Sequence, residues 1–562
     1  MKFQEMPYSR IDFDKAAAEL DSIMKEFKNA DSADEEFCAH QKYYALSDRI
    51  RTMTVLALIR HSIDTSDAFY SEEKAYYDRM LPEFANREVQ YHHLLQNSGF
   101  RADLEEKIGK PAFVNMELDA KSVSAAAIPL MQEENALGTR YEKLLASAQI
   151  PWDGDVLNMS MMTPHLTSPD RNERIRAAKA VNDYYLSIAD ELDEIYDKLV
   201  ANRQKQAEVL GFKNYTELGY CRMMRNSYSR TEVENFRCQI KKDWVPLAEE
   251  IWENRRKRLG LDKLLHLDEG VSHKDGSPRP SGTPEEILAQ GRQMYDELSP
   301  ETSEFFGFMM DNNLLDVFSR KNKQVGGYME YLPLFRAPFI FANFNGTSGD
   351  VDVITHECGH AFQGYLIGKE DDIREHWDIT METAETHSMS MEFFTNPWME
   401  RFFGERANDF LVSQLEDAIT FIPYGCMVDE FQHIIYDNPQ LTPQERKDVW
   451  KKLESEYKPH LDYGEASSFY AGGCFWQRQH HIYTMPFYYI DYAIAQTNAL
   501  QYRLWMERDR KGAWESYLKL CRLSASDFFG NMIREAGLPD PFADGQILQL
   551  ADGLRTLYRN MI

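Results

Sequence analysis

Long stretches of helix-forming residues constrain the fold of this 562-residue chain more than any other feature. Residues 175–211 combine good helix formers with apolar residues at spacings of three and four, which is the pattern of an amphipathic helix. Comparable stretches occur in both halves of the sequence. We therefore expect a mainly α-helical protein.

Three predicted helix starts share one local signal, a hydroxyl residue followed directly by proline, at Ser168, Thr283 and Thr442. A hydroxyl cap and a proline in the first helical position both favour helix initiation. After the last two caps, Glu286 and Glu445 stand where a capping box needs an acid. The sequence thus predicts where these helices begin.

Two segments rich in Pro, Gly, Ser and Asp interrupt the helical pattern, at residues 148–170 and 267–286. We place a domain boundary near the first, which separates an N-terminal helical region, residues 1–165, from a larger region, residues 166–562. The second segment is expected to be an exposed loop within the larger region.

Residues 326–350 lack the helical pattern, because aromatic and β-branched residues lie between Gly-Gly and Asn-Gly. They predict one or two short strands. Such a hairpin could serve packing alone, or it could offer an edge strand that pairs with an extended peptide through main-chain hydrogen bonds.

Composition and charge narrow the choice of partners. The 63 basic residues are outnumbered by 91 acidic ones, and the net charge of −28 disfavours nucleic acid as a partner. No run of about 18 apolar residues is present, so membrane insertion is not expected. Seven scattered cysteines suggest reduced thiols, and the first residues carry no export signal. The expected compartment is the cytoplasm.

The sequence His356-Glu357-Cys358-Gly359-His360 raises the possibility of a catalytic zinc site. On a helix, residues four apart lie on one face, so both histidines can direct a ring nitrogen at one ion, with Glu357 beside it. The metzincin continuation is excluded, because Gln363 and Leu366 occupy the positions where it needs Gly and His. A third ligand must therefore come from farther along the chain.

Two further patterns surround this motif. Ile354, Cys358, Phe362 and Tyr365 form an apolar stripe away from the histidines, so the thiol is expected in the core. The next predicted helix, within residues 377–397, carries three acids near one face: Glu382, Glu385 and Glu392. Neighbouring carboxylates repel each other unless a cation is close, which points this face at the metal. A solvated acidic face is the alternative, and spacing does not choose among the three.

HECGHAFQ, followed 25 residues after His360 by Glu385, resembles the M3 family of zinc oligopeptidases, and within it the oligoendopeptidase F branch related to thimet oligopeptidase. The resemblance covers most of the chain and is strongest over residues 168–500. It implies that Glu385 is the third ligand. It also implies two helical lobes flanking a deep channel, with residues 1–165 forming part of the channel wall.

Residues 477–496 are rich in tyrosine and histidine. This pattern would suit a packing surface as well as a site. The family resemblance implies that His481 and Tyr492 close over the substrate carbonyl, together with a second tyrosine that is either Tyr488 or Tyr489. We assign Tyr488 to catalysis and Tyr489 to substrate binding.

The resulting hypothesis is a zinc endopeptidase for short oligopeptides, with one Zn²⁺ per chain on His356, His360 and Glu385. Glu357 would act as general base. Asp352 and Glu392 would support the ligands. Residues expected to align the substrate backbone are Ala337, Phe339, Phe341 and Asn343. The alternatives are a zinc carboxypeptidase or dipeptidyl carboxypeptidase, and a peptide-binding protein without catalysis; the oligomeric state is not predicted.

Overall fold

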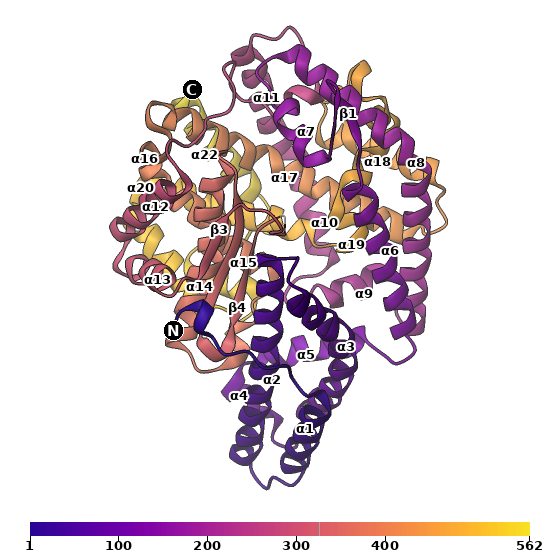
Figure 1. The fold of residues 1–562 in the computed structure, drawn as a ribbon, viewed down its shortest axis with the longest axis vertical. Coiled ribbons are helices and arrows are strands. Elements are labelled where there is room, and N and C mark those ends of the chain that lie inside the picture. The colour runs from indigo at the N-terminus through magenta and orange to yellow at the C-terminus, as the bar shows by residue number, and fades with distance from the viewer. Residues whose placement is uncertain (325) are drawn as a thin grey trace. The chain divides into compact units, whose positions relative to one another are not determined.

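The computed structural model describes residues 1–324 and 326–562, most of which lie in α-helices (Figure 1). The expected mainly α class with a small β element is confirmed. The chain forms two compact units, each assembled from three segments. The first comprises Met1–Ala120, Arg279–Ala407 and Trp505–Leu538, and the second Lys121–Pro278, Asn408–Leu504 and Pro539–Ile562. The division at residue 165 stays a prediction.

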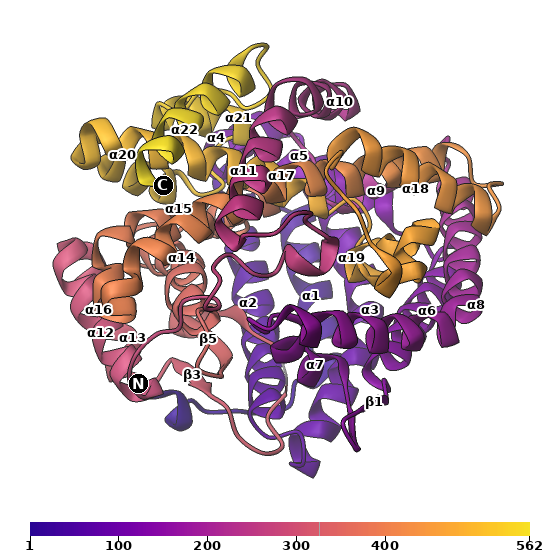
Figure 2. The same ribbon diagram turned by 90° about the horizontal axis from the view of Figure 1, so that it is seen from above.

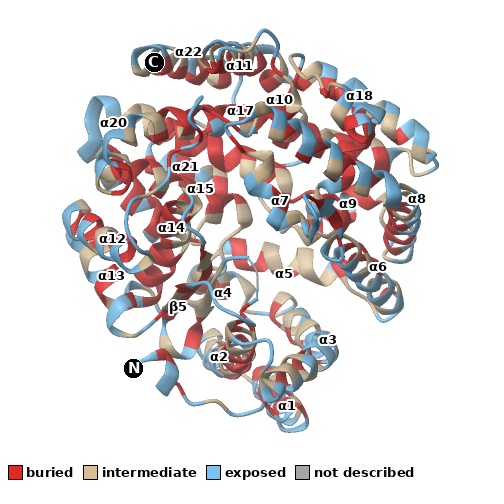
Figure 3. Ribbon diagram, turned by 45° about the horizontal axis from the view of Figure 1, so that its top comes forward, coloured by how far each residue is buried: buried red, intermediate tan, exposed pale blue. Residues whose placement is uncertain are grey.

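The first unit contains ten complete α-helices in the described part of the chain. They are α1 (Phe13–Lys28), α2 (Ala33–Ile63), α3 (Ala68–Gln96), α4 (Arg101–Ile108), α12 (Pro284–Leu298), α13 (Pro300–Asp311), α14 (Gly349–Glu370), α15 (Met381–Phe394), α16 (Met399–Phe403) and α21 (Phe529–Ala536). Buried residues run along α14, whereas α1 and α3 expose their outer faces to solvent (Figure 3).

The second unit is also helical. It holds α6 (Ile128–Ala146), α7 (Met159–Leu166), α8 (Arg171–Val209), α9 (Tyr215–Arg222), α10 (Arg230–Gln239), α11 (Val245–Leu259), α18 (Pro443–Tyr457), α19 (His480–Thr484), α22 (Gln546–Met561), nearly all of α17 (Ala407–Asp437), and a hairpin of β1 (Ile150–Trp152) and β2 (Asp155–Leu157). Two helices, α5 (Lys110–Ser122) and α20 (Tyr489–Leu523), contain points where the chain passes between units. Within the described ranges, no helix has the length and apolar character needed to cross a bilayer.

A three-stranded sheet lies beside α14 in the first unit (Figure 1). Its strand order is β3 (Leu315–Phe318), β5 (Ala337–Phe344), β4 (Tyr328–Leu332). The sequence predicts β4 and β5 but not β3, which is short and pairs parallel to β5 from a distant position in the chain.

The strand β5 occupies the centre of this sheet, and β4, from the same predicted segment, lies at an edge. β5 pairs antiparallel with β4 and parallel with β3, so it is not an edge strand, and its residues are buried except the half-buried Asn343. The Asn343 amide donates to the Gln324 and Gly326 carbonyls at 2.8 and 2.9 Å. Strand pairing therefore gives no support to a substrate contact at Ala337, Phe339, Phe341 or Asn343, which stays a prediction.

The helix caps follow the sequence signals at two of three places. Thr283 and Thr442 cap α12 and α18, and both form the expected capping boxes with Glu286 and Glu445. The third prediction is wrong by two residues, because α8 begins at Arg171 and Asp170 is its cap. An aspartate carboxylate accepts hydrogen bonds from the first turn as readily as a hydroxyl does.

Candidate active site

The helices α14 and α15 lie side by side in the first unit (Figure 2). They approach each other closely at Gly359, where a Cβ atom would lie 2.6 Å from Ser388 Cα and 2.8 Å from the His387 carbonyl oxygen. Both are backbone atoms, so only glycine fits without moving one helix. This contact brings the α15 face that carries Glu385 against the α14 histidines.

The resulting cluster contains His356, His360 and Glu385, whose potential ligand atoms all lie within 4.8 Å of one another. Oε2 of Glu385 is 3.4 Å from Nε2 of His356 and 3.6 Å from Nε2 of His360. Two imidazoles and one carboxylate, converging on one point, are a donor set that suits a catalytic zinc ion with one position left for water. The geometry therefore fits the expected metal.

The electrostatics of the cluster favour a positive charge at this point. Burial opposes protonation of His356, but hydrogen bonds to Glu385 and Glu392 outweigh it and raise the His356 pKa well above its usual value. Burial lowers the pKa of His360 to about 4, so this ring stays neutral and keeps a lone pair for a metal. Both conditions suit a bound cation.

Glu392 holds His356 from the side opposite the cluster. Nδ1 of His356 donates to Oε1 of Glu392 at 2.7 Å, which leaves Nε2 directed at Glu385. Such a bond fixes the ring orientation and tautomer of a metal ligand. Asp352, the other residue expected to support the ligands, lies half-buried in the first turn of α14, and its role stays a prediction.

Glu357 is half-buried next to the first histidine. Burial raises the pKa of its carboxyl group, and the nearby Glu385 and Glu392 add to the rise while His356 opposes it. A carboxylate with a raised pKa is a stronger base than an exposed one, which is what proton abstraction near neutral pH requires. Cys358, in contrast, is fully buried, and burial raises its thiol pKa, as expected for a residue of the apolar stripe.

The predicted tyrosine segment forms a second cluster, in the second unit. The His481 ring centroid lies 4.9 Å from Tyr489, 5.7 Å from Tyr488 and 5.9 Å from Tyr492. Gln479 Nε2 donates to His481 Nδ1 at 2.8 Å, so the ring proton is on Nε2, which is then a hydrogen-bond donor. His481, Tyr489 and Tyr492 are half-buried, whereas Tyr488 is 5% exposed.

Comparison with known proteins gives the family of the chain. A model of the peptidase M3 N-terminal domain matches residues 3–123, and a model of peptidase family M3 matches residues 294–551. A solved structure of a putative oligoendopeptidase F is 43% identical, with a TM-score of 0.93, and the alignment covers 100% of this chain and 99% of that one. The chain belongs to peptidase family M3.

Two other relatives are similar to this chain. The structure of PZ peptidase A with an inhibitor is 42% identical, with a TM-score of 0.93 and coverage of 100% of this chain and 99% of that one. An oligoendopeptidase F homolog of Borreliella burgdorferi is 22% identical over 298 residues, which are 50% of this chain and 48% of that protein. The chain thus aligns with about half the length of that curated relative. The resemblance to M3 metalloendopeptidases of the oligoendopeptidase F group is confirmed.

In this M3 peptidase, the support of the tyrosine segment was not evident from the sequence. Phe487, directly before Tyr488, has a φ of +69°, a left-handed conformation that costs a bulky residue free energy. The Arg225 guanidinium donates to the carbonyl oxygen of Phe487, and the backbone N–H of Phe487 donates to Gln432 Oε1 at 3.0 Å. Arg225 also donates to Asp491 at 3.1 Å. These buried contacts hold the backbone at Phe487 and the side chain of Asp491, on either side of Tyr488 and Tyr489.

The missed residues differ in how far sequence could have found them. Gly359 stands inside a helix between two predicted site residues, Glu357 and His360, and a helical glycine often marks a close backbone approach. Arg225 carries no comparable signal, because nothing in its local sequence links it to Phe487, 262 positions away.

Proposed function

We propose that this M3 peptidase is a zinc-dependent endopeptidase that hydrolyses short oligopeptides in the cytoplasm. The observation that carries the proposal is the convergence of the His356, His360 and Glu385 ligand atoms within 4.8 Å, with Glu357 adjoining them. These three residues would hold one zinc ion per chain. Bound there, zinc would act as a Lewis acid and lower the pKa of a bound water to about 7.

Glu357 would act as general base. Its raised pKa lets the carboxylate accept a proton during attack on the peptide carbonyl and then pass it to the leaving amine. Glu392 would keep His356 in its ligating orientation through the 2.7 Å bond to Nδ1.

The histidine and tyrosine cluster of the second unit would stabilise the oxyanion. Peptide hydrolysis builds negative charge on the carbonyl oxygen, and hydrogen-bond donors directed at it lower the barrier. His481 is arranged as an Nε2 donor by Gln479, and Tyr492 is half-buried beside it. Tyr488 is assigned as the second catalytic tyrosine; the half-buried Tyr489 is the alternative donor and otherwise a substrate contact.

The decisive experiment is Glu357→Gln. We expect the purified variant to retain about one zinc per chain while cleavage of a quenched fluorescent peptide falls by several orders of magnitude. The matched control is Glu370→Gln at the other end of α14, where the glutamate pairs with Arg522 at 2.8 Å. Cleavage by Glu357→Gln at the level of the control would refute the mechanism.

Blocked peptides separate the proposed activity from its alternatives. An endopeptidase cuts peptides that are acetylated at the N-terminus and amidated at the C-terminus, whereas a carboxypeptidase needs a free C-terminus. Mass spectrometry of the products gives the cleaved bonds. A zinc-loaded protein that cuts nothing in a peptide mixture would instead be a peptide-binding protein.

A further inference from the structure

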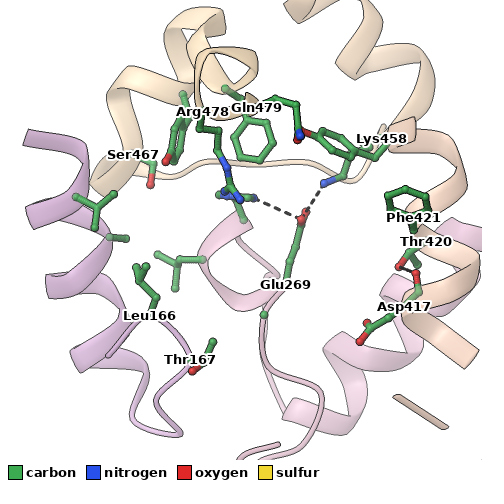
Figure 4. A pocket seen from close by; sticks show the side chains of 18 of the residues that line it. Leu166, Thr167, Glu269, Asp417, Thr420, Phe421, Lys458, Ser467, Arg478 and Gln479 are labelled. Atoms are coloured by element: carbon green, nitrogen blue, oxygen red, sulfur yellow. Dashed lines mark hydrogen bonds and ion pairs between the residues drawn. The ribbon is translucent and has the colours of Figure 1, made fainter. Parts of the chain in front are cut away.

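A cavity of about 540 Å³ lies within the second unit (Figure 4). It is formed by α7, α8, α11, α17, the start of α20 and the segments around residues 266–270 and 458–479. Six aromatic side chains line it: Trp252, Phe421, Tyr424, Tyr470, Phe475 and Tyr489. Its size and lining suit an apolar group with a few polar anchors.

Most charges of this cavity already have partners. Glu269 is paired with Lys458 at 2.8 Å, with His460 at 3.2 Å and with His266 at 3.4 Å. In Figure 4, Glu269 and Lys458 point into the cavity and toward each other. Asp417 is paired too, through Arg255 at 2.8 Å. Neither carboxylate is therefore available to neutralise a further cation.

Arg478 is different. Its side chain points into the cavity (Figure 4) and solvent reaches it, yet among residues 1–324 and 326–562 it forms no ion pair with a carboxylate. Its guanidinium stands 4.7 Å from the Phe475 ring centroid, and the Tyr470 hydroxyl lies beside it. Arginine stays charged at any working pH, so this guanidinium offers the cavity a positive charge that no carboxylate of the described residues neutralises.

The cavity adjoins the cluster assigned to the oxyanion. Tyr489 lines the cavity and also contacts His481, at 4.9 Å between ring centroids. The Tyr424 hydroxyl, in the cavity wall, donates to Gln479 Oε1 at 2.7 Å, and Gln479 in turn donates to His481. A peptide bound at His481 would thus have a neighbouring residue within reach of this cavity.

We infer that this cavity is a specificity subsite in which Arg478 binds a carboxylate of the peptide substrate and the aromatic lining receives the adjoining apolar group. A guanidinium matches a carboxylate with two parallel hydrogen bonds, and a partly enclosed site strengthens them. The carboxylate is either the C-terminus of a short peptide or an acidic side chain. The inference rests on the proposed function, because it names what the peptidase recognises.

Paired peptides test it. The two peptides of the first pair differ only at the C-terminus, which is a carboxylate in one and an amide in the other. In the second pair both peptides are amidated, and they differ only in having Glu or Gln at one position. That position is moved along the peptide in successive pairs. Binding is measured with zinc-loaded Glu357→Gln protein, and kcat/KM with the otherwise unaltered enzyme. For the recognised carboxylate we expect a preference of about 10- to 100-fold over its neutral counterpart.

Arg478→Gln, made both in the Glu357→Gln protein and in the otherwise unaltered enzyme, should reduce that preference to less than about twofold. Arg478→Lys keeps the charge but not the planar guanidinium group, and it should leave part of the preference. Arg176→Gln is the matched control, since Arg176 also stacks on an aromatic ring, Trp152, but has a carboxylate partner in Asp153 outside the cavity. The control should keep the full preference.

The outcomes separate the two proposals. If the enzyme prefers the peptide with a free C-terminal carboxylate and Arg478→Gln abolishes that preference, the site binds the C-terminus. If instead it prefers Glu over Gln and Arg478→Gln abolishes that preference, the site binds an acidic side chain. Wild-type enzyme that cleaves both members of every pair equally overturns the subsite while leaving the peptidase intact. Enzyme that cleaves no peptide overturns the proposed function itself, and the binding measurement on Glu357→Gln then still tests the carboxylate site.

Discussion

The two clusters of this peptidase are built in contrasting ways. In the first unit, both histidines and Glu357 occupy five consecutive residues of α14, and a single close contact at Gly359 brings in Glu385 from the next helix. In the second unit, His481 and the tyrosines lie where α19 ends and α20 begins, and they depend on a left-handed Phe487 that distant residues hold. A site whose residues follow helix periodicity can be predicted from the sequence, whereas a site formed by an irregular connection cannot.

The largest effect is expected when the hydroxyl donor of Tyr492 is removed. For Tyr492→Phe we expect kcat to fall about 100- to 1,000-fold while bound zinc stays at one per chain, because one hydrogen bond to the developing oxyanion is lost. Tyr502→Phe is a control in the same helix. Loss of zinc, or an unchanged kcat, would show that the two clusters are not divided into metal and oxyanion functions.

The contact between α14 and α15 is tested by Gly359→Ala. The added Cβ would meet backbone atoms at 2.6 and 2.8 Å, so α15 must shift and carry Glu385 with it. We expect zinc affinity, measured by competition with a chelator, to fall about 10- to 100-fold. At Gly364 on the same helix, an added Cβ would meet the Tyr331 ring at 3.3 Å. Gly364→Ala should therefore have little effect on zinc, and equal behaviour of the two variants would contradict the role of Gly359.

Arg225→Lys tests what holds the tyrosines in the second unit. Lysine keeps the positive charge, but its side chain is one bond shorter than that of arginine. Its ammonium group should not reach both the Phe487 carbonyl and Asp491, which Nη2 of Arg225 bonds together, so the tyrosines should lose their fixed position. We expect kcat to fall about tenfold, with zinc content and KM little changed. The control is Arg230→Lys, an exposed arginine paired with Asp437 at 2.6 Å. A variant that lowered only thermal stability would assign Arg225 a purely structural role.

The smallest expected effect concerns the pH dependence of stability in the second unit. Glu454 is buried and accepts hydrogen bonds from Trp450 and Tyr463, and burial raises its pKa to about 7. Because the folded state then holds its proton more tightly than the unfolded state, this carboxyl group lowers stability progressively as the pH rises from about 4.5 through about 7. Glu454→Gln should thus be more stable than wild type at pH 8, on the order of 1 kcal/mol, and the difference should shrink at pH 5.

Chemical denaturation at the two pH values measures this difference. A gain that was equal at pH 5 and pH 8 would contradict ionisation of Glu454 as its cause, since only the wild-type carboxyl titrates between them.

Sequence patterns anticipated those features that depend on near neighbours in the chain. The helical class, the capping boxes at Thr283 and Thr442 and the burial of Cys358 all follow from spacings of three or four residues. The sequence did not predict β3, because its pairing partner is distant in the chain. β3 pairs with β5 across more than twenty residues and makes β5 the central strand of the sheet.

By itself, then, the sequence determined the α14 motif, since helix periodicity alone places His356 and His360 on one face. Only the tertiary structure decided that α15 comes close enough at Gly359 to bring Glu385 to them, and that Arg225 holds the Phe487 turn before Tyr488. The physical reason is the range of the forces involved. Backbone periodicity acts within a few residues, whereas close packing and buried hydrogen bonds join residues that only the folded chain brings together.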